Sequence, residues 1–101
     1  MSRSAMEGIL ETALYARDLD AAERFYRDVL GLEVITRVQG RHVFFRCGAA
    51  VLLIFNPQET VKPPSPDALP VPPHGATGAG HACFRVAREN FADIIARLDA
   101  A

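Results

Sequence analysis

The residues that could carry chemistry in this chain lie outside every common catalytic motif. The 101 residues contain no Gly-x-Gly-x-x-Gly, phosphate-binding loop, Gly-x-Ser-x-Gly or His-Glu-x-x-His pattern. Nucleotide binding, serine hydrolysis and zincin chemistry therefore have no support in the sequence. Cys47 and Cys83 lie far apart without metal-ligand spacing, so we expect two reduced, buried thiols.

Glu11 and His81 differ from the other candidates because an internal repeat pairs them. Aligning His81 with Glu11 lays HACFRVAREN over ETALYARDLD and brings Ile95 into register with Phe25. The apolar positions of the two copies agree better than the residue identities do, as is typical of a structural repeat. A solvated carboxylate and a histidine bonded to the backbone beside Gly80 are the plainer interpretations of this pair.

The remaining polar candidates have simpler explanations. His42 follows a turn and His74 lies in a Pro/Gly-rich segment, so we expect both to contact solvent. Helix capping accounts for Asp18 and Asp20. Arg85, within a predicted strand, must reach solvent, a carboxylate or a cleft, because an unpaired buried charge is costly.

Glu11 and Tyr15 lie in a predicted strand that is followed by a predicted helix. Residues 8–16 alternate as a strand with one core face. The segment DLDAAERFYRDVLG predicts a helix of about three turns that starts with Asp20 and Glu23 in capping-box spacing and ends at Gly31 as a left-handed cap. The stripe expected to face the core consists of Ala21, Ala22, Phe25, Val29 and Leu30.

Three further strands and a long connection follow. Residues 32–38, 41–47 and 51–55 are separated by gaps short enough to predict antiparallel hairpins. All seven prolines fall between Pro57 and Pro73, so regular structure is not expected in this stretch.

After this connection the first pattern returns. Residues 81–86 alternate as a strand, and Asn90 precedes a helix whose apolar residues are Phe91, Ile94, Ile95 and Leu98. We therefore expect an α+β fold with a first βαβββ module at residues 1–56, a Pro/Gly-rich linker at 57–80, and the truncated βα start of a second module at 81–101.

These segments resemble a known family, the vicinal oxygen chelate superfamily of glyoxalase I, bleomycin and fosfomycin resistance proteins and extradiol dioxygenases. The likeness rests on ETALYARDLDAAERFYRDVLGLEV, on AVLLIFNP, and on GAGHACFRV after the Pro-rich stretch. In that family, paired βαβββ modules form a half-open barrel that holds a divalent metal.

The resemblance implies roles for four residues. Glu11 and His81 stand at metal-ligand positions, with Glu11 also catalytic, and Tyr15 and Arg85 would bind substrate if their strand faces line the barrel. The stretch VLLI carries no carboxylate where glyoxalase I has a Glu, with Leu52 at that position, and the sequence lacks the strand that would carry a further ligand. The implied cofactor is a divalent ion, Fe, Mn, Ni or Zn.

The resemblance therefore implies a metal-dependent lyase, isomerase or dioxygenase that acts on a small substrate with vicinal oxygens. The alternatives are a metal-free protein that sequesters a drug or ligand, as bleomycin resistance proteins do, and an inactive fragment. A lone curved sheet exposes its edges and half of its apolar face, so we expect it to pair either with its own missing half or with a second copy, as a homodimer.

The net charge and the lack of long apolar runs exclude several classes of binding partner. Eleven Lys and Arg against twelve Asp and Glu leave a formal charge of -1, so nucleic acid and anionic membranes are not expected partners. The sequence contains no apolar run of membrane-spanning length and no signal-peptide pattern, so we expect a cytoplasmic protein.

Overall fold

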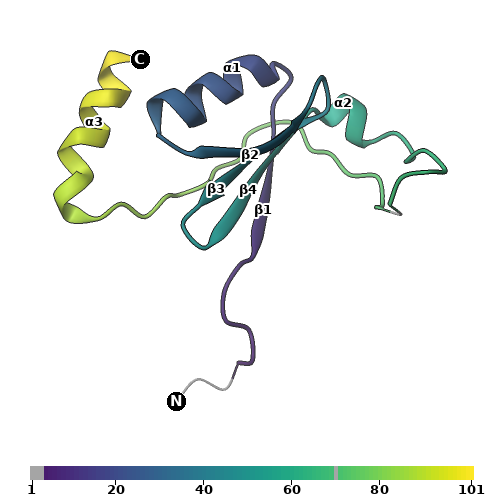
Figure 1. The fold of residues 1–101 in the computed structure, drawn as a ribbon, viewed down its shortest axis with the longest axis horizontal. Helices are drawn as coiled ribbons and strands as arrows, with labels where there is room; N and C mark the ends of the chain where they lie inside the picture. Colours follow the sequence, from purple (N-terminus) through teal and green to yellow (C-terminus); the bar gives the residue numbers. More distant parts are fainter. Residues whose placement is uncertain (1–3, 70) are drawn as a thin grey trace.

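A four-stranded sheet is the centre of the structure, a computed structural model that describes residues 4–69 and 71–101 (Figure 1). The strands are β1 (Glu11–Tyr15), β2 (Glu33–Val38), β3 (His42–Cys47) and β4 (Ala50–Phe55), in the order β1-β4-β3-β2. β1 runs parallel to β4, whereas β3 is antiparallel to both β2 and β4. This arrangement confirms the expected α+β fold with one βαβββ module.

One helical segment covers one face of the sheet. It begins as α1 (Leu19–Glu23) and continues as the π-helical η1 (Arg24–Val29). The predicted capping box was wrong: Asp18 is the N-cap, because its extended backbone lets its carboxylate accept from the N–H of Ala21 at 2.9 Å. Gly31 has a φ of 76°, which confirms the predicted left-handed cap.

The π-helical turn changes which side chains reach the core. Leu19 and Ala22 pack on the sheet as part of a core completed by Val43, Phe45, Leu52 and Ile54. Phe25, expected in the core stripe, is 39% exposed. The i to i+5 bond from the N–H of Leu30 to the carbonyl of Phe25 widens this turn, so a stripe drawn at 3.6 residues per turn drifts off the sheet.

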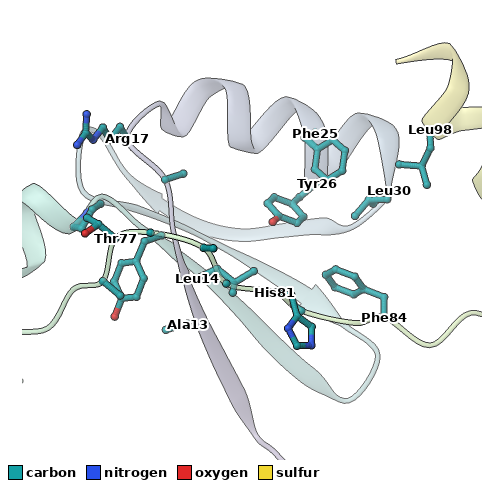
Figure 2. Close-up of a pocket in the computed structure, with 18 residues that line it drawn as sticks. Ala13, Leu14, Arg17, Phe25, Tyr26, Leu30, Thr77, His81, Phe84 and Leu98 are labelled. Carbon is teal, nitrogen blue, oxygen red and sulfur yellow. The ribbon is translucent and has the colours of Figure 1, made fainter.

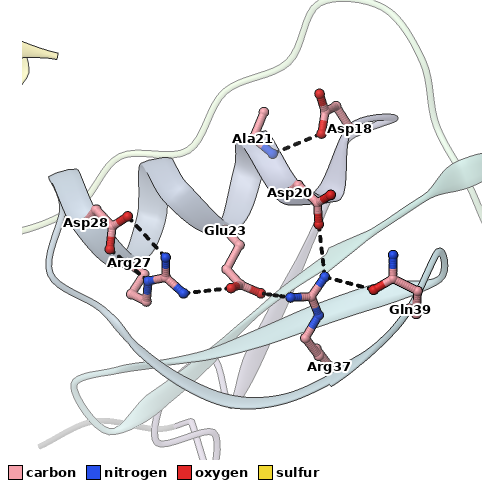
Figure 3. A network of polar contacts seen from close by, with 8 residues as sticks. All are labelled: Asp18, Asp20, Ala21, Glu23, Arg27, Asp28, Arg37 and Gln39. Atoms are coloured by element: carbon pink, nitrogen blue, oxygen red, sulfur yellow. Dashed lines mark hydrogen bonds and ion pairs between the residues drawn. The ribbon is translucent and has the colours of Figure 1, made fainter.

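A network of ion pairs fastens the helix to β2 (Figure 3). Glu23 is buried, and its carboxylate oxygens lie 2.7 Å from Arg27 and 3.0 Å from Arg37. Arg37 also contacts Asp20 at 2.9 Å, and Arg27 pairs with Asp28. The hydrogen bonds from Arg27 lower the pKa of the Asp28 carboxyl.

The second part of the chain differs more from expectation. The Pro-rich stretch opens with a short helix, α2 (Pro57–Thr60), capped by the side chain of Asn56. The prediction of a strand at residues 81–86 was wrong: the segment is irregular, because it pairs with no strand among the described residues. The helical prediction was right, with η2 (Arg88–Asn90) leading into α3 (Phe91–Ala100). The division into a linker and a second module stays a prediction.

The thiols also depart from expectation. Cys47 on β3 is half-buried and partly packed on the core, but Cys83 is exposed. The buried environment predicted for Cys83 was therefore wrong: the residue lies on the irregular segment 81–86, which no strand covers among the described residues.

Candidate functional site

A hollow of about 860 Å³ lies along the free edge of β1 (Figure 2). Among the described residues, β1 pairs with β4 alone, so its other edge is open. Residues 13–17 form one wall, and residues 76–82 with Phe84 form the opposite wall. The volume lies in the range of small-molecule sites.

Aromatic and aliphatic side chains close the helical side of the hollow. Tyr26 of η1 packs edge-on to Phe25, with 5.1 Å between the ring centroids, and lies 6.5 Å from Phe84. Leu30, at the end of η1, and Leu98, in α3, complete this side. Burial raises the pKa of the Tyr26 hydroxyl above its ordinary 10.0, so at neutral pH it stays a neutral phenol.

Two of the predicted site residues line the hollow. Tyr15 is half-buried on β1. His81 is exposed on the facing segment (Figure 2). The hydroxyl of Tyr15 is 2.9 Å from Nδ1 of His74. The structure thus brings Tyr15 and His81 to one hollow.

Glu11 and Arg85 are not among the residues that line it. Glu11 is exposed at the start of β1, in register with Val51 of β4. Arg85 is exposed on the irregular segment. Their assigned roles stay predictions.

The strand next to Glu11, β4, carries the stretch VLLI that lacks a carboxylate. Leu52 was placed where glyoxalase I has its carboxylate, but Leu52 packs in the core beneath the helix. Leu53, in register with Ala13, lies outside that core on the opposite face. The cross-strand neighbour of Glu11 on β4 is Val51, so the side chain beside Glu11 is apolar. The correspondence of Leu52 with the glyoxalase I carboxylate stays a prediction.

The donors for a metal are incomplete. Glu11 and His81 are suitable ligand types, but a catalytic ion in proteins is usually held by three side chains. Residues 4–69 and 71–101 contain no group of three or more His, Cys, Asp or Glu side chains that could hold one. These residues therefore do not form a metal centre by themselves.

His42 was expected in solvent, and that expectation was wrong. His42 is 9% exposed, and its ring stacks on the ring of Phe44 with 4.1 Å between the centroids. Nδ1 lies 2.6 Å from the Arg41 guanidinium. Burial, and secondarily the charge of Arg41, lowers the pKa of His42.

His74 was the second histidine expected in solvent, but it is half-buried. Its ring lies edge-on to Phe55, with 4.5 Å between centroids. With Tyr15 and His42, it belongs to a continuous set of rings on the sheet around Phe55. The alternation of His42 with Phe44 was a usable signal for the first histidine, whereas His74 had no local signal.

The fold and its site define a known class. The sequence profile of the Glyoxalase/Bleomycin resistance protein/Dioxygenase superfamily matches residues 8–101, and the chain belongs to that superfamily.

Solved structures agree with this membership. The chain is similar to the lactoylglutathione lyase from Agrobacterium tumefaciens, with 46% identity and a TM-score of 0.84 over 96% of this chain and 72% of that one. A glyoxalase/dioxygenase from Nostoc punctiforme shares the fold at 21% identity and a TM-score of 0.66, over 99% of this chain and 73% of that one. No curated protein matches the chain significantly.

The helices are short compared with the thickness of a bilayer. Within the described part of the chain, none is long and apolar enough to cross a membrane.

Proposed function

We propose that this chain is a metal-dependent enzyme of the glyoxalase/dioxygenase type that acts on a small substrate with vicinal oxygens. Glu11 and His81 are the proposed metal ligands, and Glu11 is also the proposed catalytic residue. The observation that carries the proposal is that Glu11 begins β1 and His81 lines the hollow along the free edge of that strand. The 46% identity with a lactoylglutathione lyase supports a reaction of this class.

A metal ion at this site needs at least one ligand besides Glu11 and His81. Two side chains do not hold a divalent ion firmly against water. We propose that a second copy of the chain supplies the missing ligand in a homodimer, and that the ion is Fe, Mn, Ni or Zn. The open edge of β1 supports such an association, because unpaired strand edges favour pairing.

The walls of the hollow suit a small ligand. Tyr15 and Tyr26 provide phenol groups beside apolar surface, and we propose that Tyr15 binds substrate. Arg85 is proposed to approach an anionic substrate from the facing segment. A cytoplasmic location stays part of the proposal.

Metal titration of the purified full chain tests the ligand assignment. We expect Glu11→Gln and His81→Ala each to lower the affinity for Ni²⁺ or Zn²⁺ by about tenfold or more in isothermal titration calorimetry. Glu7→Gln is the matched control, because Glu7 is an exposed acid on the segment before β1. Affinity that is the same in all variants would show that the assignment is wrong.

The alternative is a metal-free protein that sequesters a ligand. The apolar Val51 beside Glu11 and the incomplete set of donors in the described residues favour it. Titrating bleomycin into protein treated with EDTA separates the two functions. Saturable binding without metal supports sequestration, and its absence together with stoichiometric metal binding supports the enzyme.

A further inference from the structure

His74 fastens the segment that forms one wall of the hollow. Its main-chain N–H donates to the carbonyl of Thr60 in α2 at 2.9 Å. Its ring packs edge-on against Phe55, and its Nδ1 is 2.9 Å from the hydroxyl of Tyr15. One residue thus joins α2, the sheet and the wall.

Gly75 makes this attachment close. A Cβ at Gly75 would lie 2.7 Å from Cγ1 of Val61 and 3.4 Å from Pro57. Any larger residue would therefore push the segment away from α2 or displace Val61. We call His74 and Gly75 together the His74 anchor.

Beyond the anchor, the wall lacks main-chain support. In the described parts of the chain, no main-chain hydrogen bond involves residues 75–86. Residues 76–82 nevertheless line the hollow, and His81 is one of them. The placement of His81 therefore depends on how the segment is held at its ends.

The contact between His74 and Tyr15 has a preferred direction. A phenol is a stronger acid than a neutral imidazole N–H, and an imidazole nitrogen is a stronger acceptor than a phenol oxygen. In the tautomer with an unprotonated Nδ1, the Tyr15 hydroxyl donates to Nδ1. The lone pairs of the Tyr15 oxygen stay available to accept from a ligand hydroxyl.

We propose that His74 is a positioning residue: by fastening the wall to Tyr15 and Phe55, it sets the place of His81 across the hollow from β1 and orients the Tyr15 hydroxyl. The inference rests on the proposed function, in which His81 binds the metal and Tyr15 binds substrate. It adds the residue through which those two groups are held together, and it favours a substrate that carries at least one hydroxyl.

The test uses four single variants of the full chain and one double variant. His74→Ala removes the ring, and Tyr15→Phe removes the same hydrogen bond from the other end with little change in volume. His74→Asn keeps a side-chain acceptor near the position of Nδ1. Glu59→Gln is the control, because Glu59 lies in α2 and pairs with Lys62, not with His74.

Two measurements are made on each variant, after circular dichroism has shown that it is folded. Backbone ¹⁵N relaxation gives the order of residues 76–82, and calorimetry gives the affinity for Zn²⁺ alone. We expect His74→Ala and Tyr15→Phe to lower the order of the wall and to weaken Zn²⁺ binding by about threefold to tenfold. His74→Asn and Glu59→Gln should retain both properties, and the Tyr15→Phe/His74→Ala double variant should be no worse than either single one.

The outcomes separate this inference from the function on which it rests. Unchanged order in both His74→Ala and Tyr15→Phe would overturn the inference, as would loss of order in Glu59→Gln of the same size. Reduced order in a protein whose wild type binds no Zn²⁺ would support the anchor and contradict the metal-dependent function alone.

Discussion

The two copies of the internal repeat have the same pattern but different structures. In the first copy, β1 pairs with β4 along its whole length, and Leu19 and Ala22 of the following helix are buried on the sheet. In the second copy, residues 81–86 are irregular, and α3 has no buried residue. A strand followed by a helix is thus predicted twice by the sequence, and the strand forms once.

The difference between the two copies shows that hydrophobic periodicity predicts which face a side chain lies on, but not whether a neighbouring element is present. Alternation assigns side chains to faces, but a strand forms only where a neighbour accepts its main-chain hydrogen bonds. Helical spacing likewise predicts an apolar face without supplying the surface that covers it. β1 has β4 as its neighbour, whereas the described residues give 81–86 no neighbour.

The helices of the two copies each carry an ion pair at the same spacing. Glu23 and Arg27 form an i,i+4 ion pair in the first copy, and Asp93 and Arg97 form the same pair in the second. In the first pair, Glu23 is buried and also contacts Arg37 of β2. Both side chains of the second pair are exposed, so the two pairs have the same spacing in different surroundings.

The largest expected effect compares two phenylalanines. Phe45 is 0% exposed beneath the helix, and Phe91 of α3 is 59% exposed. We expect Phe45→Ala to lower the free energy of unfolding by about 3 to 5 kcal/mol and Phe91→Ala to change it by less than about 0.5 kcal/mol. Urea denaturation followed by circular dichroism measures both. A large loss for Phe91→Ala would show that α3 is covered by another chain.

An intermediate effect compares the two ion pairs. Arg37→Ala leaves the buried Glu23 carboxylate with one cation fewer, so we expect a loss of about 1 to 2 kcal/mol. Arg97→Ala removes an exposed pair and should cost less than about 0.5 kcal/mol. Equal losses in thermal and urea unfolding would contradict the claim that burial makes the first pair different.

The smallest effect is a pH dependence that arises in the first copy. The folded-state pKa of His42 lies below its ordinary value of 6.5, so the folded chain takes up this proton at lower pH than the unfolded chain does. Its contribution to stability is therefore complete above about pH 6.5 and declines as the pH falls toward the folded-state pKa, by at most about 1.4 kcal/mol per pH unit.

His42→Phe removes the titrating group and keeps a ring that can stack on Phe44. Urea midpoints between pH 5 and 8 should show a smaller decrease at low pH in this variant than in the wild type (about pH 6.5 being where the two curves begin to separate). Parallel curves would mean that the burial of His42 does not influence stability in this range.

The sequence was sufficient for those elements of the fold whose signals are local. The hairpins of β2, β3 and β4 follow from alternation and short gaps, and Gly31 ends the helix as its position predicts. The π-helical turn was not predictable, because it breaks the period from which the stripe was drawn. The missing strand at 81–86 depends on a partner, which no local pattern describes.

The candidate site was predictable only in part, for the same reason. His81 was proposed from the repeat alignment and Tyr15 from the resemblance; both line the hollow, and their roles stay predictions. His74 could not be found, because its contact with Tyr15 joins residues 59 positions apart.

The most direct test of the central claim is elemental analysis of the purified, untagged wild-type chain after dialysis, with its native mass measured on the same sample. The proposed function predicts a dimer that retains near-stoichiometric Fe, Mn, Ni or Zn, held by Glu11, His81 and a ligand from the second copy. A dimer that retains no metal, and takes up none when each ion is added, would contradict it.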